Sequence, residues 1–338
     1  MTIASSDTLG SVSRWVRLGG VLTLLVAATS WVAVLQAQES SVPVAASSRL
    51  SAGDEETAFM CPMHPDISQG TPGVCGRCGM ALVIGTPFDM RNYGLEVRSD
   101  PEVVRVGEPV TLHLGVSHPG TGERVTQFEW VHDKLYHFFV LSQDRESFQH
   151  LHPEQSDDGT WAITVTLPKP GHYTLISDFV PSGGTPQFLS TALVTEGYRG
   201  DLVAGLAQLV PDEVPPKKTI GRLTASVSFD PEPLVAATHV HLTFHLADAK
   251  TDEPVTDIQP YLGAYGHMLI VSEDLVDFVH SHPVEMIPLG IDPETARGGP
   301  DIIFDGTLPK AGRYRAFAQF RHHDEVQTFP FTFEVDTH

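Results

Sequence analysis

An internal repeat limits the fold of this chain more than any other feature of its sequence. Residues 108–153 align without gaps on residues 238–283. After an insertion in the second copy the match resumes, and Thr166 to Tyr173 aligns with Thr307 to Tyr314. Self-similarity over this length is typical of a duplicated structural unit, so we expect two copies of one domain.

Both copies have the residue pattern of β-strands. Apolar residues alternate with polar neighbours, as in Trp161, Ile163, Val165 and Leu167 of the first copy and Val240, Leu242, Phe244 and Leu246 of the second. A period of two residues is typical of strands with one buried face. We therefore predict a mostly β fold in which residues 92–197 and 220–337 are tandem antiparallel β-sandwiches, immunoglobulin-like or cupredoxin-like, joined by a linker at 198–219.

The N-terminal region has the pattern of a membrane anchor. Arg14 and Arg17 precede an apolar run from Leu18 to Leu35. A span of about 20 apolar residues crosses a bilayer, and preceding basic residues keep the N-terminus in the cytoplasm. We predict that residues 1–37 are a cytoplasmic N-terminal region and an anchor helix, with the soluble part in the periplasm or outside the cell. The alternative is a cleaved signal peptide and a secreted or periplasmic protein.

The charge of the chain is strongly acidic. Asp and Glu number 42 against 21 Lys and Arg, which gives a formal net charge of −21. Such a surface repels nucleic acid and attracts cations, so we expect no nucleic-acid partner. Residues 38–58 are rich in Ser, Ala and acidic residues and have no hydrophobic period, which predicts a flexible linker.

All three cysteines of the chain lie in one short segment, residues 59–84. Cys61 and His64 form a Cys-x2-His pair, and Cys75 and Cys78 form a Cys-x2-Cys pair after ten residues. Two such short chelating turns can enclose a tetrahedral ion. A segment of about 25 residues cannot bury a useful hydrophobic core, so something else must hold it, and a metal is the obvious candidate. The four residues are therefore our predicted metal ligands.

The motifs Cys61-Pro62-Met63-His64-Pro65 and Cys75-Gly76-Arg77-Cys78-Gly79-Met80 carry a family resemblance. The segment resembles the small heavy-metal-binding domain that accompanies bacterial copper-exporting ATPases and periplasmic efflux adaptors. The resemblance implies a bound copper or zinc ion and makes an envelope metal-transport protein a candidate partner. The rest of the chain has neither the further membrane spans of a pump nor the long heptad hairpin of an adaptor.

Two questions about this segment stay open at the level of sequence. Three thiolates and an imidazole suit zinc, whereas the methionines of the segment, Met60, Met63 and Met80, would add soft ligands for Cu(I). A disulfide between Cys75 and Cys78 is the alternative to metal binding in an exported protein.

Each copy of the repeat also carries a histidine triad with the same spacing. The two triads are His137, His150 and His152, and His267, His280 and His282. A hairpin turning near Asp144-Arg145 would place the first histidine of a triad opposite the His-x-His pair. Three imidazoles would then converge in each copy, in an arrangement that suits Cu(II) or Zn(II). The alternative is that they are ordinary strand histidines, and the outcome depends on strand register.

The β region carries a second resemblance, to exported bacterial proteins of unknown role that are built from such sandwiches. It is carried by Lys134 to His137, Phe148 to Pro153, Tyr261 to His267 and Phe278 to Pro283, and it implies a fold more than an activity. No cysteine follows residue 78, so a blue-copper centre in the sandwiches is excluded.

Together these features predict a metal-binding protein that carries, senses or buffers copper or zinc in the cell envelope, and that is not an enzyme. One alternative is a non-catalytic sandwich scaffold or interaction protein. A less favoured alternative is a His-ligated metalloenzyme, such as a dismutase-like protein. After His152 only His172 follows in the first copy, which is too few ligands for a dismutase, and no Gly-x-Ser-x-Gly turn indicates a nucleophile.

Overall fold

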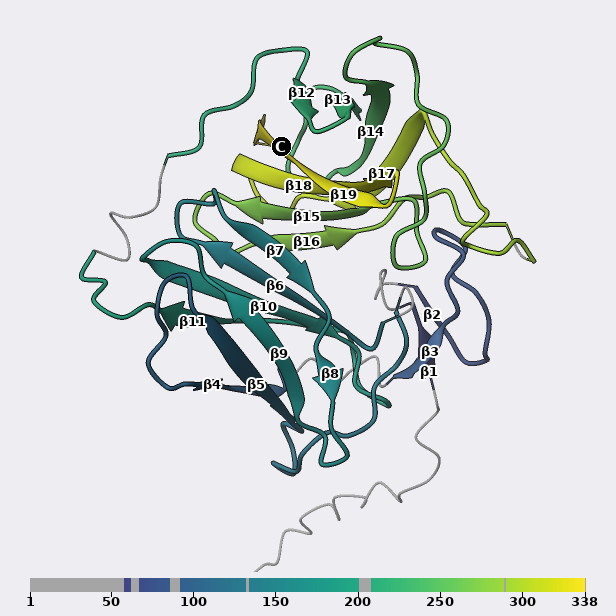
Figure 1. Cartoon of the computed structure of the whole chain (residues 1–338). Helices are drawn as coiled ribbons and strands as arrows, with labels where there is room; N and C mark the ends of the chain where they lie inside the picture. Colours follow the sequence, from purple (N-terminus) through teal and green to yellow (C-terminus); the bar gives the residue numbers. More distant parts are fainter. Residues whose placement is uncertain are drawn as a thin grey trace, which may run out of the picture. The chain divides into compact units, whose positions relative to one another are not determined.

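The structure is a computed structural model, and it describes residues 58–61, 67–85, 92–131, 134–200, 208–288 and 290–337. Every regular element within these ranges is a β-strand (Figure 1). No helix in the described part of the chain is long and apolar enough to cross a bilayer. The predicted anchor at 1–37 and nearly all of the predicted linker at 38–58 lie outside the described residues. The described residues all belong to one compact structural unit, Asp54–His338.

The cysteine-bearing segment contains one small antiparallel sheet. Its strands are β1 (Ala58–Met60), β2 (Ser68–Gln69) and β3 (Val83–Gly85), in the order β2-β1-β3. The bridge between Val74 and Ala81 closes the turn that holds two of the cysteines. The apolar residues that it buries gather around the cysteines, in a small cluster of Cys61, Cys75 and Leu82 with Phe59 and Ile67 packed against it.

The first repeat has two antiparallel sheets of four strands. One contains β4 (Gly94–Asp100), β5 (Pro109–Ser117), β8 (Glu154–Gln155) and β9 (Trp161–Thr166), in the order β4-β5-β9-β8. The other contains β6 (Tyr136–Ser142), β7 (Phe148–Leu151), β10 (His172–Phe179) and β11 (Gln187–Val194), in the order β11-β10-β6-β7. One hydrophobic cluster takes residues from both sheets, among them Leu112, Phe138 and Val165, so the repeat is a β-sandwich.

The second repeat has the same architecture. One sheet contains β12 (Lys217–Ile220), β13 (Leu223–Asp230), β14 (His239–Asp248) and β17 (Asp301–Thr307), in the order β12-β13-β14-β17. The other contains β15 (His267–Ser272), β16 (Phe278–Ser281), β18 (Gly312–His322) and β19 (Glu325–Val335), in the order β16-β15-β18-β19. The predicted mostly β fold with antiparallel sheets is confirmed.

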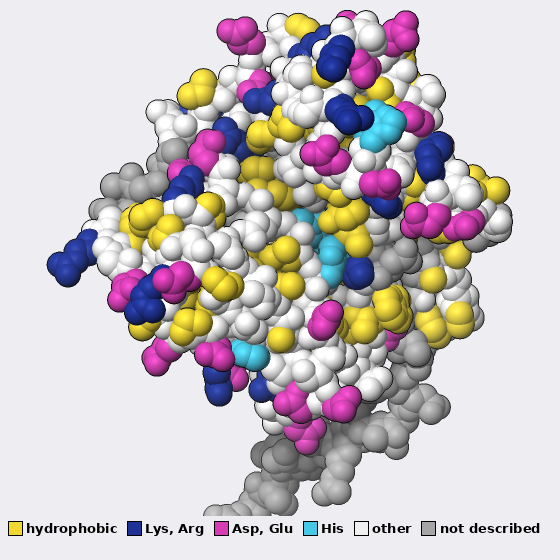
Figure 2. Space-filling model, in the orientation of Figure 1, with side chains coloured by type: hydrophobic (Ala, Val, Ile, Leu, Met, Phe, Trp, Pro, Cys, Tyr) yellow, Lys and Arg dark blue, Asp and Glu magenta, His cyan; other side chains and the backbone are white. Residues whose placement is uncertain are grey.

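The alternation in β14 separates a buried face from a solvent face, as its sequence predicts. Val240, Leu242 and Phe244 are buried, whereas His239 and His245 are exposed. These two histidines contact Asp305 and Asp301 of the neighbouring strand β17. Figure 2 shows acidic side chains (magenta) interspersed with basic ones (dark blue) over the visible face of the protein.

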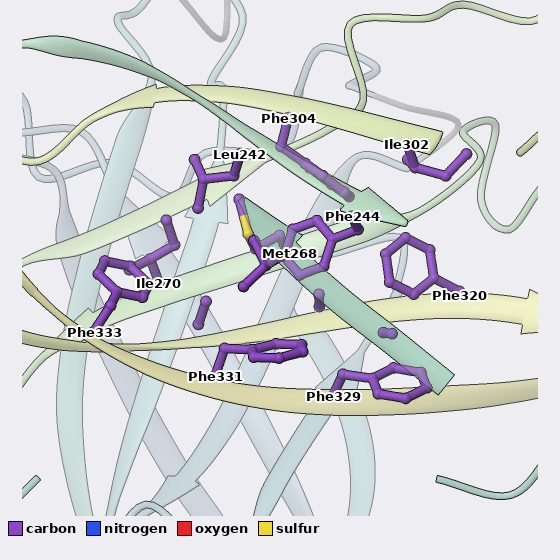
Figure 3. Packing of buried hydrophobic residues seen from close by; sticks show 14 of the residues in the cluster. Leu242, Phe244, Met268, Ile270, Ile302, Phe304, Phe320, Phe329, Phe331 and Phe333 are labelled. Carbon is purple, nitrogen blue, oxygen red and sulfur yellow. The ribbon is translucent and has the colours of Figure 1, made fainter. Parts of the chain in front are cut away.

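Six phenylalanines contribute to the core of the second repeat (Figure 3). Phe244 of β14 and Phe304 of β17 meet edge to face at 5.5 Å, and Phe320 and Phe331 cover them from the opposite sheet. Offset and edge-to-face ring pairs of this kind add to the hydrophobic stabilisation. The two sheets are therefore held at a fixed separation, which positions the outer face of the sheet that contains β15.

The outer faces of two sheets are apolar as well. Every residue of β6 and of β15 is buried, which an antiparallel strand with one solvent face would not show. The residues responsible come from β6, β10, β15 and β18 and form one cluster, Phe139, Leu141, Ile176, Leu269, Val271 and Phe317. Phe148 and Phe317, one from each repeat, stack at 4.4 Å with an interplanar angle of 5°. The two sandwiches thus pack against each other through these sheets.

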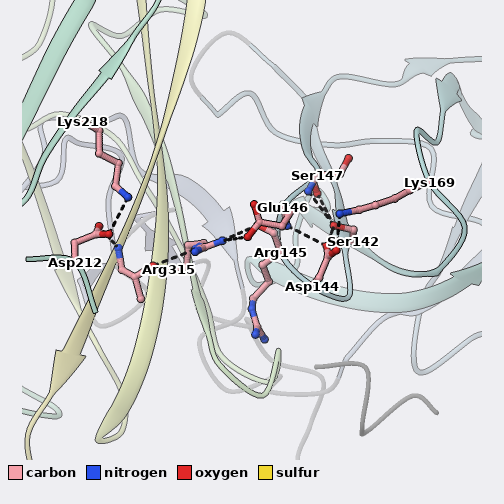
Figure 4. Close-up of polar contacts among 10 residues, drawn as sticks. Ser142, Asp144, Arg145, Glu146, Ser147, Lys169, Asp212, Lys218 and Arg315 are labelled. Carbon is pink, nitrogen blue, oxygen red and sulfur yellow. Dashed lines mark hydrogen bonds and ion pairs between the residues drawn. The ribbon is translucent and has the colours of Figure 1, made fainter. Parts of the chain in front are cut away.

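Polar contacts accompany this apolar contact between the repeats (Figure 4). Arg315 of β18 donates to the backbone oxygen of Arg145 at 3.1 Å and to the carboxylate of Glu146 at 3.0 Å. Arg145 in turn donates to the backbone oxygen of Glu273. Since Arg145 and Glu146 lie in the β6–β7 turn, these bonds fix the hairpin of one repeat against the other.

We expect Phe179→Ala to lower the free energy of unfolding of the first repeat by about 3–5 kcal/mol. Phe179 is 2% exposed, and its ring stacks on Tyr136 at 4.9 Å. Urea unfolding followed by tryptophan fluorescence, to which the buried Trp161 contributes, measures the change. The control is Val103→Ala, whose side chain is 44% exposed and whose replacement should cost no more than about 0.5 kcal/mol. Equal midpoints for the two variants would contradict this account of the core.

Candidate metal centres

The three cysteines converge on one point of the small sheet. Cys61 follows β1 directly, and Cys75 and Cys78 lie in the turn closed by Val74 and Ala81. Gly79, with φ of +74°, donates from its N–H to the Cys75 carbonyl at 2.8 Å and so bends this turn back on itself. Cys61 and Cys75 are buried, and no disulfide joins any two of the three cysteines.

The sulfur geometry fits a tetrahedral metal ion. The three Sγ atoms lie within 4.8 Å of one another, and those of Cys61 and Cys78 are 3.6 Å apart. Ligands at a zinc–sulfur distance of about 2.3 Å in a tetrahedron are separated by about 3.8 Å. We call these three residues the cysteine site. The predicted fourth ligand, His64, lies outside the described residues.

The cysteine site borders the first β-sandwich. Met80 is buried in a small cluster with Val131 and Val180 of that repeat, and Cys78 packs against the cluster. Met80 therefore has a packing role in addition to the ligand role considered from the sequence. Val131 also contacts one of the triad histidines, because its carbonyl oxygen forms a hydrogen bond with His137.

The first triad converges as the predicted hairpin requires. β6 pairs with β7 so that Phe139 lies opposite His150, which places His137, His150 and His152 on one face. His137 Nδ1 is 3.3 Å from His150 Nε2 and 3.3 Å from His152 Nε2. On its other side, His137 Nε2 donates to the Val131 carbonyl at 3.0 Å. His137 and His150 are buried, and His152 is partly exposed.

The second triad has the same strand pairing. Leu269 lies opposite His280, so His267, His280 and His282 share a face, and all three are buried. His267 Nε2 donates to the Tyr261 carbonyl at 2.7 Å, which is the counterpart of the bond between His137 and Val131. The ring centroids of His280 and His282 are 4.4 Å apart, and those of His267 and His282 are 4.6 Å apart.

Sequence reasoning treated the triads as two separate sites, but the structure brings them together. The histidine-bearing faces are those that pack between the repeats, so the ring centroids of His137 and His280 lie 4.8 Å apart and those of His150 and His267 lie 5.3 Å apart. His150, His267 and His280 offer nitrogen atoms within 4.8 Å of one another. We call the six residues of the two triads the histidine cluster.

Two polar residues that the sequence did not single out support the histidine cluster from opposite repeats. Asp178 of the first repeat lies beside His137 in the sheet, but its carboxylate accepts from His280 Nδ1 at 2.6 Å. Gln319 of the second repeat accepts from His150 Nδ1 at 3.0 Å. Phe179 aligns with Phe320, so Asp178 and Gln319 occupy equivalent positions in the two repeats. This equivalence was the signal in the sequence that could have pointed to both residues.

Burial keeps the first triad uncharged at neutral pH. Loss of hydration and, to a smaller extent, the neighbouring His280 lower the pKa of His137 to about 4. Burial likewise lowers the pKa of His152 to about 3, and that of His150 falls well below its usual value. Neutral imidazole is the form that binds metal ions, so these residues need no deprotonation before they coordinate one.

In metal-free protein these pKa values predict acid destabilisation of the first repeat. A histidine whose pKa is lower in the folded state adds stability above its unfolded pKa of 6.5, and this stability is lost as the pH falls toward the folded value. For His137 alone the loss between about pH 7 and about pH 5 is roughly 2 kcal/mol. Urea midpoints from tryptophan fluorescence at the two pH values measure it. Replacing His137, His150 and His152 by Gln should reduce the difference, and an undiminished difference would rule out this cause.

Family models match two parts of the chain. The model described as a domain of unknown function, DUF8832, matches residues 90–196 and again residues 219–337. The model described as a heavy metal binding domain matches residues 58–84. The predicted duplication and the predicted heavy-metal-binding segment are thus confirmed. No curated protein matches the chain.

Several solved structures are similar to the chain at low identity. FdeC, an Escherichia coli adhesin, shares 15% identity over 73% of this chain and 66% of its own, with a TM-score of 0.23. The adhesin InvE of Yersinia pseudotuberculosis shares 13% over 72% of this chain and 60% of its own, with a TM-score of 0.21. The chain thus spans less than two thirds of either adhesin structure. At these TM-scores the likeness carries no conclusion about function.

Proposed function

The chain belongs to the DUF8832 family, whose description names no activity, and we propose from its own residues that it is an exported, membrane-tethered protein that binds copper or zinc. Its role in this proposal is the carriage, sensing or buffering of the metal in the cell envelope. The observation that carries the proposal is the convergence of three cysteine sulfurs inside the segment that matches the heavy metal binding domain.

The contact between the cysteine site and the first sandwich supports carriage in particular. Val131 packs with Met80 next to Cys78 through its side chain, and its carbonyl accepts a hydrogen bond from His137. One residue thus touches both the segment that holds the thiolates and a member of the histidine cluster. In the proposed mechanism an ion exchanges its ligands between the cysteine site and these histidines, or between the cysteine site and an envelope metal-transport protein.

Binding fits the histidine cluster better than catalysis does. A catalytic zinc keeps a coordination position open to water or substrate. His137 and His267 are each 1% exposed, and only His152 of the six histidines is partly exposed. A substrate would have no approach to an ion held there, whereas an ion could enter past His152. We therefore propose no enzymatic activity for this site.

The acidic surface and the N-terminal sequence support the remaining parts of the proposal. A formal net charge of −21 favours the approach of cations in the envelope. Arg14 and Arg17 before the apolar run from Leu18 to Leu35 favour tethering by a single helix, with the metal-binding part outside the cytoplasm. A cleaved leader would leave the same part in the periplasm or secreted.

Replacing Cys61, Cys75 and Cys78 by Ser should remove about one metal ion per chain, because one tetrahedral site needs these thiolates. Metal content is measured on chain purified without a chelator or a histidine tag and then loaded with copper or zinc. The matched control is Val74→Ala, which alters a 66% exposed side chain of the same segment and should retain the ion. A parent chain that takes up neither metal would overturn the proposal and favour the scaffold alternative.

The location is tested separately by fusing alkaline phosphatase, which is active only outside the cytoplasm, to the chain after residue 337 or before Leu18. We expect activity from the first fusion only, because the basic residues hold the N-terminus inside. The chain should sediment with membranes, and its mass should include residues 1–37. Loss of that mass from a soluble periplasmic product would indicate cleavage, and an inactive first fusion would contradict export.

A further inference from the structure

We propose that the six histidines of the histidine cluster form one metal centre with two adjacent ion sites, built jointly by the two repeats. Site 1 consists of His137, His150 and His152, and site 2 combines His267 and His280 of the second repeat with His150 of the first. The ring of His282 packs against His267 and His280 beside site 2. The inference deepens the metal-binding function proposed above, but it concerns residues that are separate from the cysteine site. The ligand is a divalent transition-metal ion that prefers imidazole, such as Zn(II) or Cu(II).

The spacing of the nitrogen atoms in site 1 fits a single ion. His137 Nδ1 lies 3.3 Å from His150 Nε2 and 3.3 Å from His152 Nε2. Three imidazoles at a zinc–nitrogen distance of about 2.0 Å in a tetrahedron are separated by about 3.3 Å. The site therefore has the dimensions of an ion-binding position, and partly exposed His152 gives access to it.

Hydrogen bonds on the far side of each ring determine which nitrogen faces the site. The Val131 carbonyl can only accept, so His137 Nε2 carries the hydrogen and Nδ1 presents a lone pair. Gln319 donates its amide to Thr328, so its oxygen faces His150 and accepts from Nδ1, which leaves the lone pair on His150 Nε2. Two lone pairs that face each other at 3.3 Å repel unless a cation lies between them.

Site 2 has the same design with a stronger partner. His280 Nδ1 donates to the Asp178 carboxylate at 2.6 Å, and its Nε2 is buried with no hydrogen-bond partner among the described residues. The side chain of His280 is only 2% exposed. A carboxylate on the outer nitrogen of a ligand histidine fixes its orientation and makes the inner nitrogen a better metal ligand.

The support for each site comes from the opposite repeat. Gln319 of the second repeat orients His150 of site 1, and Asp178 of the first repeat orients His280 of site 2. In addition, nitrogen atoms of His150, His267 and His280 lie within 4.8 Å of one another, so the two repeats contribute to the same group of ligand atoms. Neither repeat therefore completes its own ion site, and this dependence distinguishes one joint centre from two independent ones.

The test uses the full chain with Cys61, Cys75 and Cys78 replaced by Ser, so that only the histidines are assayed. Zn(II) affinity is measured by competition with a chromophoric chelator. Replacing all six histidines of the cluster by Asn should abolish this binding. Replacing three exposed histidines instead, His239, His241 and His245, is the matched control and should leave binding unchanged.

The deciding variants remove the support from the opposite repeat. Gln319→Leu and Asp178→Asn should each weaken Zn(II) binding by roughly ten- to a hundredfold, the usual effect of losing the hydrogen-bond partner of a ligand histidine. The control is Gln327→Leu, since Gln327 is also buried in the second repeat but lies against Gly221. Tryptophan fluorescence and circular dichroism verify that each variant is folded.

A second measurement avoids variants of the cluster altogether. Cu(II) added at two equivalents to the serine-substituted chain should give the spin-coupled paramagnetic resonance spectrum of two neighbouring ions. Affinities equal to the Gln327→Leu control, or two uncoupled copper signals, would refute the joint centre. Absence of zinc binding in the serine-substituted chain would also refute it, while metal retained by the parent would leave the cysteine site standing.

Discussion

The packing of two sheets against each other, face to face, is the interaction on which the rest of the structure depends. Phe139 and Leu141 lie on the same face of β6 as His137, and Leu269 and Val271 hold the matching places on β15 beside the second triad. Burial of these apolar side chains stabilises the contact, and the histidines on the same faces are buried as a result. The desolvation that lowers the pKa values of His137, His150 and His152 is a direct consequence of that hydrophobic contact.

Burying six imidazoles is unfavourable unless their nitrogen atoms have partners. Four of the outer nitrogens are satisfied within the protein, since His137 and His267 use backbone carbonyls while His150 and His280 use side chains of the opposite repeat. In the first triad the inner nitrogens face one another instead, with His137 Nδ1 at 3.3 Å from the Nε2 atoms of His150 and His152. A protein that needed only a stable contact would be better served by apolar residues there, so the polar cluster indicates a purpose other than stability.

Local sequence patterns predicted the folds of the repeats but could not predict how they meet. The alternation of Trp161, Ile163 and Val165 indicates which face of one strand is buried, and the Cys-x2-Cys spacing indicates a turn. Both features can be predicted because they depend on residues that are close in the sequence. Which outer face is covered depends on a partner distant in the sequence. Phe139 and Leu141, on the face of His137, were the available sign that this face is not solvent-exposed.

The duplicated positions 178 and 319 also have an evolutionary meaning. Two identical copies of one domain, associated about a twofold axis, would place equivalent residues in equivalent surroundings. When both copies are joined in a single chain, their sequences need not stay identical, because each copy can then mutate separately. One copy carries an aspartate, Asp178, where the other carries Gln319. The fused chain can therefore present two unequal electrostatic environments, which a symmetric homodimer of one such domain could never encode.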